Sequence, residues 1–214
     1  MAETMYGLGG RLALLDPGDL SSKAQLLYDE ILAGVVPAAN KAGFRSMDEE
    51  KHLIGPFNAT LYSPEMCGSF LALQKAEAKH TTLTTRTRQV VILSVGSVWK
   101  AAYELYAHAA VAKAAGITPQ QVEALAVGQQ PERLTADEKL AQAFTLELVS
   151  THAVSSHTYA AARESFGDRG LVKMVTLIGC YLSVCALLNA FQIPAPETPH
   201  KQEVNHDSYA SGNT

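Results

Sequence analysis

Residues 83–118 read LTTRTRQVVILSVGSVWKAAYELYAHAAVAKAAGIT, and this stretch decides the fold. Thr84 or Thr85 is a suitable N-cap for a helix that continues through the apolar run ending at Val95. Gly96 and Ser97 predict an interruption, after which an alanine-rich helix extends from 99 to 115 and stops at Gly116. The stretch therefore predicts two consecutive helices, with no alternating strand pattern in either.

The second predicted helix carries a carboxylate and an imidazole four positions apart, at Glu104 and His108. Residues at this spacing share one face of a helix, here in an apolar setting that favours burial. One interpretation is a satisfied pair that only stabilises the helix. The other is a functional site, because burial perturbs the pKa of acidic and basic groups and such groups cluster where chemistry occurs.

The remainder of the chain is also predicted to be helical. Cap residues, apolar periodicity and proline positions predict helices at about 22–42, 64–79, 119–126, 135–150, 155–166 and 168–190, with a connecting stretch at 43–58. The tail from 197 to 214 is polar and is expected to be flexible. The sequence thus predicts an all-α protein.

Composition limits the classes of partner. The net charge is −4 and basic clusters are absent, so a nucleic acid is not expected. The apolar segment 171–191 is better explained as a core helix than as a membrane span, and no signal peptide is evident, so we expect a cytoplasmic protein without membrane contact. Low charge (18%) and many alanines indicate that some surface is buried in a homo-oligomer.

Cysteines and histidines give no sign of a metal centre. Cys67, Cys180 and Cys185 lack metal-binding spacing, and the seven histidines are scattered. Glu104 and His108 could supply two ligands to a metal ion, and Glu147 or His152 would have to complete the site. Nothing in the sequence brings these residues together. We therefore predict no metal site.

Several motifs together resemble the carboxymuconolactone decarboxylase family, which shares its fold with alkyl hydroperoxidase D. They are Leu83–Arg88, the run 90–95, Tyr103-Glu104-x3-His108, Ala115–Thr118, Gly55–Asn58, Ser63–Glu65, Phe166–Asp168 and Leu187–Phe191. The resemblance covers about residues 22–196. It implies an alkyl hydroperoxidase D-like helical bundle at 64–196 preceded by a helical extension at 1–63, and a homo-oligomer, with a trimer or hexamer favoured.

The chain departs from that family at the positions that matter for chemistry. The redox branch carries a CxxC motif, and its two cysteine positions are here Ala101 and Glu104. A thiol–disulfide cycle needs two sulfurs, so this branch's peroxidase mechanism is excluded at the site. Family members commonly have a glutamate where this chain has Gln89, and an amide does not carry a proton at neutral pH.

The resemblance implies a cofactor-independent lyase that acts on a small carboxylated or lactone-like substrate. Its catalytic residues would be Glu104 and His108, which transfer a proton to or from the substrate. Substrate-binding positions would be Gln89, Trp99, Tyr103 and Arg88. Aromatic residues at helical spacing are more often plain core, and Arg86 or Arg88 at the start of a helix more often contacts a glutamate or a neighbouring subunit. Two alternatives remain open: a non-catalytic oligomer that binds a small molecule, and a non-thiol peroxidase-like protein.

Overall fold

The structure, a computed structural model, describes residues 7–197. The described part is built from helices, and its single β-type contact is an isolated bridge between Met47 and Leu53. The elements in order are η1 (Pro17–Asp19), α1 (Ser22–Ala42), α2 (Pro56–Thr60), α3 (Pro64–His80), α4 (Thr85–Trp99), α5 (Ala102–Ala114), α6 (Pro119–Ala126), α7 (Ala136–Thr151) and α8 (Ser156–Ala190). The all-α prediction is confirmed.

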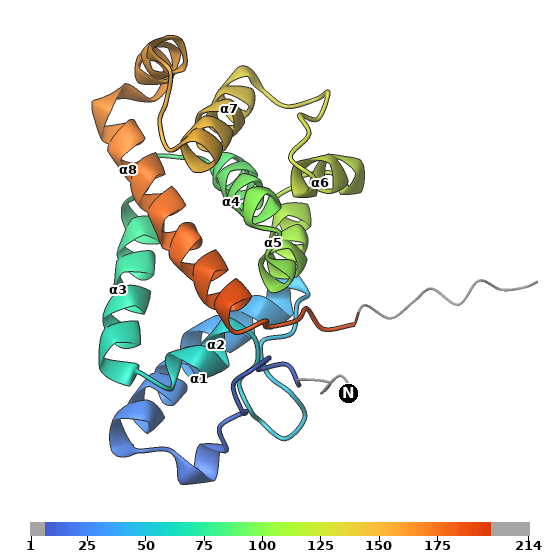
Figure 1. Ribbon diagram of the computed structural model, residues 1–214, viewed down its shortest axis with the longest axis vertical. Helices are drawn as coiled ribbons and strands as arrows, with labels where there is room; N and C mark the ends of the chain where they lie inside the picture. Colours follow the sequence, from blue (N-terminus) through green and yellow to red (C-terminus); the bar gives the residue numbers. More distant parts are fainter. Residues whose placement is uncertain (1–6, 198–214) are drawn as a thin grey trace, which may run out of the picture.

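Helix α4 lies at the centre of the bundle and contacts α5, α6, α7 and α8 (Figure 1). Its residues Val90 to Leu93 are fully buried, as expected for a helix that is apolar on all sides. Thr84 caps it by accepting a hydrogen bond from the backbone N–H of Thr87. Because α4 separates two of the three hydrophobic clusters, side chains on its surface reach several neighbouring helices.

The predicted interruption at Gly96 is wrong, and α4 continues to Trp99. A Cβ atom on Gly96 would lie 3.0 Å from Leu105 Cδ2, so the glycine permits close packing of α5 rather than ending α4. The turn occurs at Lys100, which adopts a left-handed conformation with φ 51°. Helix α5 therefore begins at Ala102, three residues later than predicted.

Most other helix boundaries agree with the sequence prediction. Ser21, Thr118 and Thr135 accept the expected N-cap hydrogen bonds, and the last two form capping boxes. The short helix α2, in the region predicted as a connection, was missed. Helix α8 contains the expected break at Gly167, where φ is 65°.

The apolar part of α8 has one buried face and one exposed face. By length and composition this helix could cross a membrane, and 39% of its most apolar window is buried in the described structure. The buried side chains include Met174, Leu177 and Leu188, which belong to the main core. The expected core role is thus present along one side, where α8 lies beside α3 and α4 (Figure 1).

The N-terminal segment packs on the same bundle. Leu8, Leu12 and Leu14 contact the main core, and α1 packs against α3 in a second cluster. The boundary predicted at residue 63 stays a prediction. The expected flexible tail lies outside the described residues, apart from Glu197.

Candidate functional site

Helix α5 places Glu104 and His108 side by side inside the bundle, as their spacing predicts. The Glu104 side chain is 4% exposed and that of His108 is 15% exposed. Glu104 Oε1 lies 3.2 Å from His108 Nε2, but the geometry leaves this buried oxygen without a hydrogen bond. A buried carboxylate with an unsatisfied oxygen is costly, so a structural role alone explains the pair poorly.

Gln89 on α4 contacts the other side of the imidazole. Its Oε1 lies 2.8 Å from His108 Nδ1, and the Gln89 side chain is buried. With the amide oxygen as acceptor, Nδ1 carries the ring hydrogen and Nε2 presents its lone pair toward Glu104. Gln89 therefore contacts His108 directly.

Burial determines the protonation of both groups. It raises the pKa of Glu104 from 4.5 to about 8. Burial also lowers the pKa of His108 from 6.5 to about 3, and the positive charge of Arg88 adds to this effect. At neutral pH the pair is thus a protonated carboxylic acid beside a neutral imidazole. Its proton donor is Glu104, whereas His108 is available as an acceptor.

Tyr181 on α8 is a neighbour of the pair that the sequence analysis missed. Its ring meets the His108 ring edge to face, with centroids 5.0 Å apart. Burial, with the charge of Glu104 as the next cause, raises the pKa of the Tyr181 phenol, so it stays protonated. The only sequence signal was an aromatic residue within an apolar helix, which is ordinary for a core position.

Arg86 and Arg88 both pair with glutamates of the same chain. Arg86 Nε lies 2.8 Å from Glu138 Oε1, and its Nη1 also donates to the carbonyl of Gly116. Arg88 Nη2 lies 2.7 Å from Glu77 Oε2, with side-chain exposures of 14% and 4%. Arg86 thus joins α4 to the start of α7. The positive charge of Arg88 instead helps to lower the pKa of His108.

The two aromatic residues predicted to bind substrate have different surroundings. Tyr103 is buried, its ring packs edge to face on Phe57 and Tyr106, and its hydroxyl donates to the carbonyl of Arg45 at 2.6 Å. It therefore anchors the loop before α2. Trp99 is 37% exposed at the end of α4, where its carbonyl accepts a hydrogen bond from Asn189. No described contact joins Trp99 to Glu104.

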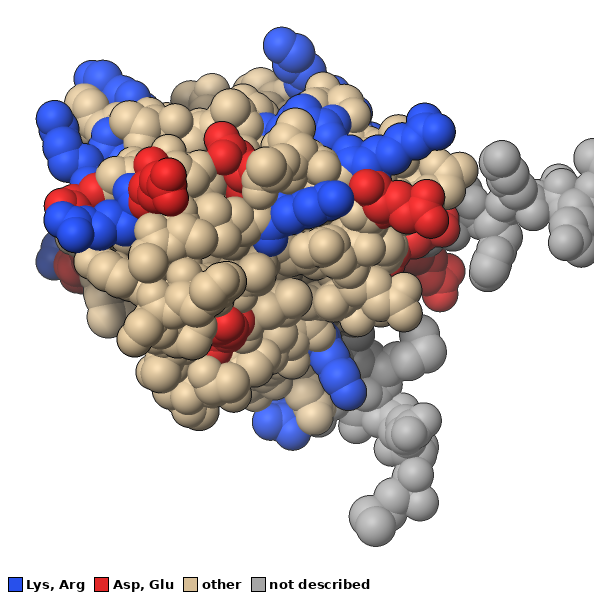
Figure 2. Space-filling view, turned by 90° about the horizontal axis from the view of Figure 1, so that it is seen from above, with Lys and Arg blue, Asp and Glu red and all other residues tan. Residues whose placement is uncertain are grey.

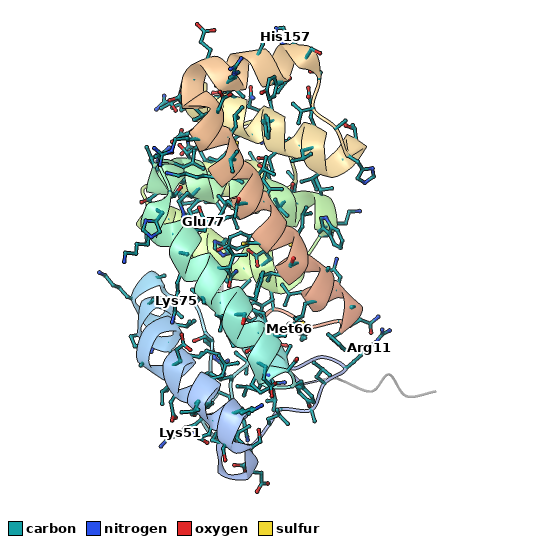
Figure 3. All side chains as sticks on the ribbon, turned by 90° about the vertical axis from the view of Figure 1, so that its left-hand side faces the viewer. Arg11, Lys51, Met66, Lys75, Glu77 and His157 are labelled. Carbon is teal, nitrogen blue, oxygen red and sulfur yellow. The ribbon has the colours of Figure 1, made fainter. Side chains whose placement is uncertain are left out.

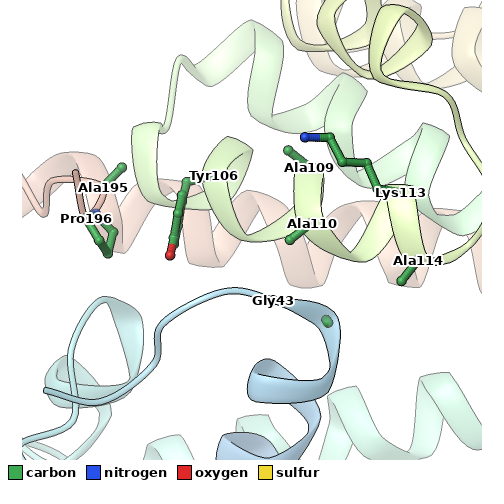
Figure 4. Close-up of a pocket in the computed structure, with 9 residues that line it drawn as sticks. Gly43, Tyr106, Ala109, Ala110, Lys113, Ala114, Ala195 and Pro196 are labelled. Carbon is green, nitrogen blue, oxygen red and sulfur yellow. The ribbon is translucent and has the colours of Figure 1, made fainter. Parts of the chain in front are cut away.

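An open groove lies on the opposite face of α5 from His108. This open groove of about 580 Å³ is lined by Ala42, Gly43, Tyr106, Ala109, Ala110, Lys113, Ala114, Ala195 and Pro196 (Figure 4). Small side chains on α5 form its wall, and Lys113 supplies the only charged group that lines it. The acid–base pair does not line the groove.

Of the two residues considered for completing a metal site, Glu147 has hydrogen-bond partners elsewhere. Glu147 is occupied by the backbone N–H of Ser155 and the hydroxyl of Thr158. Within residues 7–197, the group with suitable geometry for a metal ion is Asp48, Glu50 and His52, in the loop before α2. It lies on a different segment from the pair on α5.

Comparison with known proteins agrees with the motifs. Residues 64–147 match the model of the carboxymuconolactone decarboxylase family. The matched segment makes up less than half of the chain and includes α3, α4, α5 and α6. The match contains Gln89, Glu104 and His108, so the candidate site lies within the matched segment. A search of curated proteins finds no match.

Solved structures share the whole fold at low sequence identity. An uncharacterized peroxidase-related protein from Silicibacter sp. TM1040 is 18% identical, with a TM-score of 0.73, over 94% of this chain and 98% of that one. A second peroxidase-related protein, from Ralstonia eutropha JMP134, is 17% identical, with a TM-score of 0.70, over 88% and 93%. A debrominase, Bmp8, solved as a cysteine-to-alanine variant with 2,3,4-tribromopyrrole, is 13% identical, with a TM-score of 0.66, over 90% and 93%. These likenesses show an alkyl hydroperoxidase D-like fold.

Proposed function

We propose that the chain is a cofactor-independent enzyme of the decarboxylase type, with Glu104 as its proton donor. The observation that carries the proposal is the buried Glu104 carboxyl group, whose Oε1 lies 3.2 Å from His108 Nε2 without a hydrogen bond. A carboxylic acid with a pKa near 8 can protonate carbon at neutral pH. The match to the family model supports a role of this kind, and the solved structures with this fold include a debrominase in complex with a small ring compound.

The proposed reaction begins with a small carboxylated lactone. As the carbon–carbon bond to the carboxylate breaks, carbon dioxide leaves and the bonding electrons move into the unsaturated lactone. The Glu104 O–H then gives its proton to carbon as those electrons return, and the resulting Glu104 carboxylate regains a proton from solvent by way of His108. Gln89 fixes the tautomer of His108, and Arg88 binds the substrate carboxylate. Trp99 and Tyr103 remain proposed substrate contacts.

Turnover of 4-carboxymuconolactone tests this proposal, measured as carbon dioxide release and ultraviolet change. The wild type should turn the compound over, and Glu104→Gln should lose at least about 100-fold in rate, because the amide has no acidic proton. Glu138→Gln is the matched control, since it neutralises another buried glutamate outside the site, and it should keep full activity. A folded wild type without turnover would refute the decarboxylase assignment, and equal rates in wild type and Glu104→Gln would refute the role of Glu104.

A non-catalytic small-molecule-binding role is the second candidate. The groove beside Tyr106 and Lys113 favours it, because this cavity is separate from the acid–base pair and large enough for a small ligand. Under this proposal Lys113→Met would abolish ligand binding, and Glu104→Gln would leave it unchanged. The reverse pattern in a binding assay would remove this candidate.

We also propose a soluble homo-oligomer, a trimer or hexamer, in which α3 and α8 form the subunit contact. Val172 and Val175 on α8 are 67% and 44% exposed, and Met66 and Leu73 on α3 are 68% and 47% exposed. The two helices lie side by side (Figures 1 and 3). Exposed apolar residues gathered on adjacent helices are typical of an interface. A monomeric mass by light scattering would contradict the proposal.

The charge on the face that Figure 2 shows suits a small-molecule substrate better than a nucleic acid. On the face that Figure 2 shows, lysine and arginine are interspersed with acidic residues and leave wide uncharged areas. A nucleic-acid-binding face would need clustered basic residues.

A further inference from the structure

A second buried ion pair lies beside the proposed acid–base site. Arg88 Nη2 on α4 is 2.7 Å from Glu77 Oε2 on α3, and the Glu77 side chain is 4% exposed. Arg88 precedes Gln89, the residue that contacts His108, so the two pairs occupy adjacent positions on α4. Tyr181 lies within electrostatic range of Glu104, Arg88 and Glu77 together.

This ion pair is incompletely satisfied, unlike its neighbour on the same helix. Glu77 Oε1 is buried and has no hydrogen bond of good geometry, although the Thr81 side chain is near enough to offset part of the rise that burial causes in the pKa of this carboxyl group. By contrast, Glu138 uses both oxygens, since Oε1 accepts from Arg86 and Oε2 accepts from the backbone N–H of Thr135. An unsatisfied buried oxygen costs about 1–3 kcal/mol, and a buried ion pair contributes little net stability. Beyond neutralising the buried Arg88, the Glu77 carboxylate therefore adds little net stability.

Arg88 has the properties of a binding residue for a planar carboxylate. Its guanidinium can present two parallel N–H donors to such a group, whereas Glu77 is placed against a single nitrogen. Glu77 lies one turn before the end of α3 at His80, close to solvent-exposed residues. The Arg88 side chain is itself 14% exposed, so it lies at the edge of the buried region.

We propose that Glu77 is a built-in substitute for the carboxylate of the ligand. In the free protein it neutralises Arg88, and a small ligand carboxylate displaces it and binds Arg88 next to Tyr181 and His108. The ligand class is a small planar molecule with one carboxylate and an apolar body. This inference rests on the proposed function only in taking Arg88 as the residue that receives the carboxylate.

Displacement makes Glu77 a determinant of affinity and selectivity. A ligand carboxylate must compete with the Glu77 carboxylate for Arg88. Weakly acidic or neutral analogues cannot displace Glu77, so Arg88 adds nothing to their affinity. Removing the negative charge of Glu77 leaves a buried cation without its counter-ion, which is strongly unfavourable. An added carboxylate relieves that cost, so the affinity for carboxylates should rise when Glu77 is neutralised.

Benzoate and its uncharged isostere benzamide test the inference by calorimetry on the full chain. Glu77→Gln should bind benzoate at least about tenfold more tightly than the wild type, with benzamide unchanged, and Arg88→Gln should lose benzoate binding. Glu138→Gln is the matched control, because it neutralises the partner of Arg86 two residues away, and its benzoate affinity should equal that of the wild type.

Two results would overturn the inference. One is a folded Glu77→Gln variant that binds benzoate no more tightly than the wild type, and the other is Arg88→Gln with unchanged benzoate affinity. If Glu77→Gln fails to fold, Glu77→Asp takes its place, because the shorter side chain withdraws from Arg88 and should also tighten benzoate binding. The assay measures no turnover, so it stands whether or not 4-carboxymuconolactone is a substrate.

Discussion

Glu104→Gln should remove a pH dependence of stability that the buried carboxyl group imposes on the wild type. The folded-state pKa of Glu104 is raised from 4.5 to about 8. Between these values the folded protein keeps the Glu104 proton and the unfolded chain releases it, so the free energy of unfolding falls as pH rises. The variant cannot ionise at this position and lacks the effect.

The magnitude follows from the width of this window. It spans about 3.5 pH units, each worth ~1.36 kcal/mol, so the wild type should lose about 5 kcal/mol relative to the variant between pH 4.5 and 8. His108 acts in the opposite direction at lower pH, because its folded-state pKa is lowered from 6.5 to about 3 and stability falls as pH decreases through that range. Burial is the main cause of this second shift, so it persists in Glu104→Gln and cancels in the difference.

Urea denaturation of both proteins at matched concentration, at pH 5, 6.5 and 8, measures the difference. The free energy of unfolding of the wild type minus that of Glu104→Gln should decrease steadily from pH 5 to pH 8. A difference that stays constant over this range would refute the conclusion that Glu104 is protonated in the folded protein.

Three further predictions address the neighbourhood of the site and the proposed interface. Gln89→Glu places a carboxylate against the imidazole, and NMR titration should show the His108 pKa raised by at least about one pH unit. Gly55→Ala should destabilise the fold by about 3 kcal/mol in urea denaturation, because φ is +66° and the new Cβ would lie 2.3 Å from the Tyr103 ring. Val175→Glu should dissociate the oligomer, seen as a reduced mass in light scattering.

Matched substitutions serve as controls for these predictions. Gly34→Ala lies within α1 with open space around the new Cβ, so it should leave stability unchanged or raise it by up to about 1 kcal/mol. Val127→Glu adds the same charge at a 68% exposed position away from α3 and α8, and it should leave the mass unchanged. If Gly34→Ala destabilised the fold as much as Gly55→Ala, the explanation from backbone strain and close packing would be wrong. If Val127→Glu reduced the mass as Val175→Glu does, the proposed interface would be wrong. An unchanged His108 pKa in Gln89→Glu would contradict the first prediction.

Local signals predicted most of the helices. Thr118 and Thr135 were recognisable because capping involves residues only three positions apart, and Gly167 because a left-handed conformation favours glycine. The prediction at Gly96 was wrong because a glycine within a helical pattern has two possible meanings. It can end a helix or permit close packing, and only the position of Leu105 in the folded chain distinguishes the two.

In the candidate site too, contacts within one helix could be predicted from the sequence, whereas contacts between helices could not. The Glu104–His108 contact follows from helical spacing within α5, and the sequence predicted it. Tyr181 and Glu77 reach the site from α8 and α3, and no spacing rule relates them to α5. Whether a buried carboxyl group is satisfied also depends on tertiary packing, so the unsatisfied oxygens became visible only in the structure.

The central claim is that Glu104 carries a proton at neutral pH. Carbon-13 NMR titration of the glutamate side-chain carboxyl groups tests it directly, with Glu104→Gln to assign the signal. We predict a Glu104 midpoint about 3.5 pH units above the ordinary value of 4.5, near pH 8. A midpoint close to 4.5 would contradict the claim, because Glu104 would then be ionised at neutral pH and unable to donate the proton.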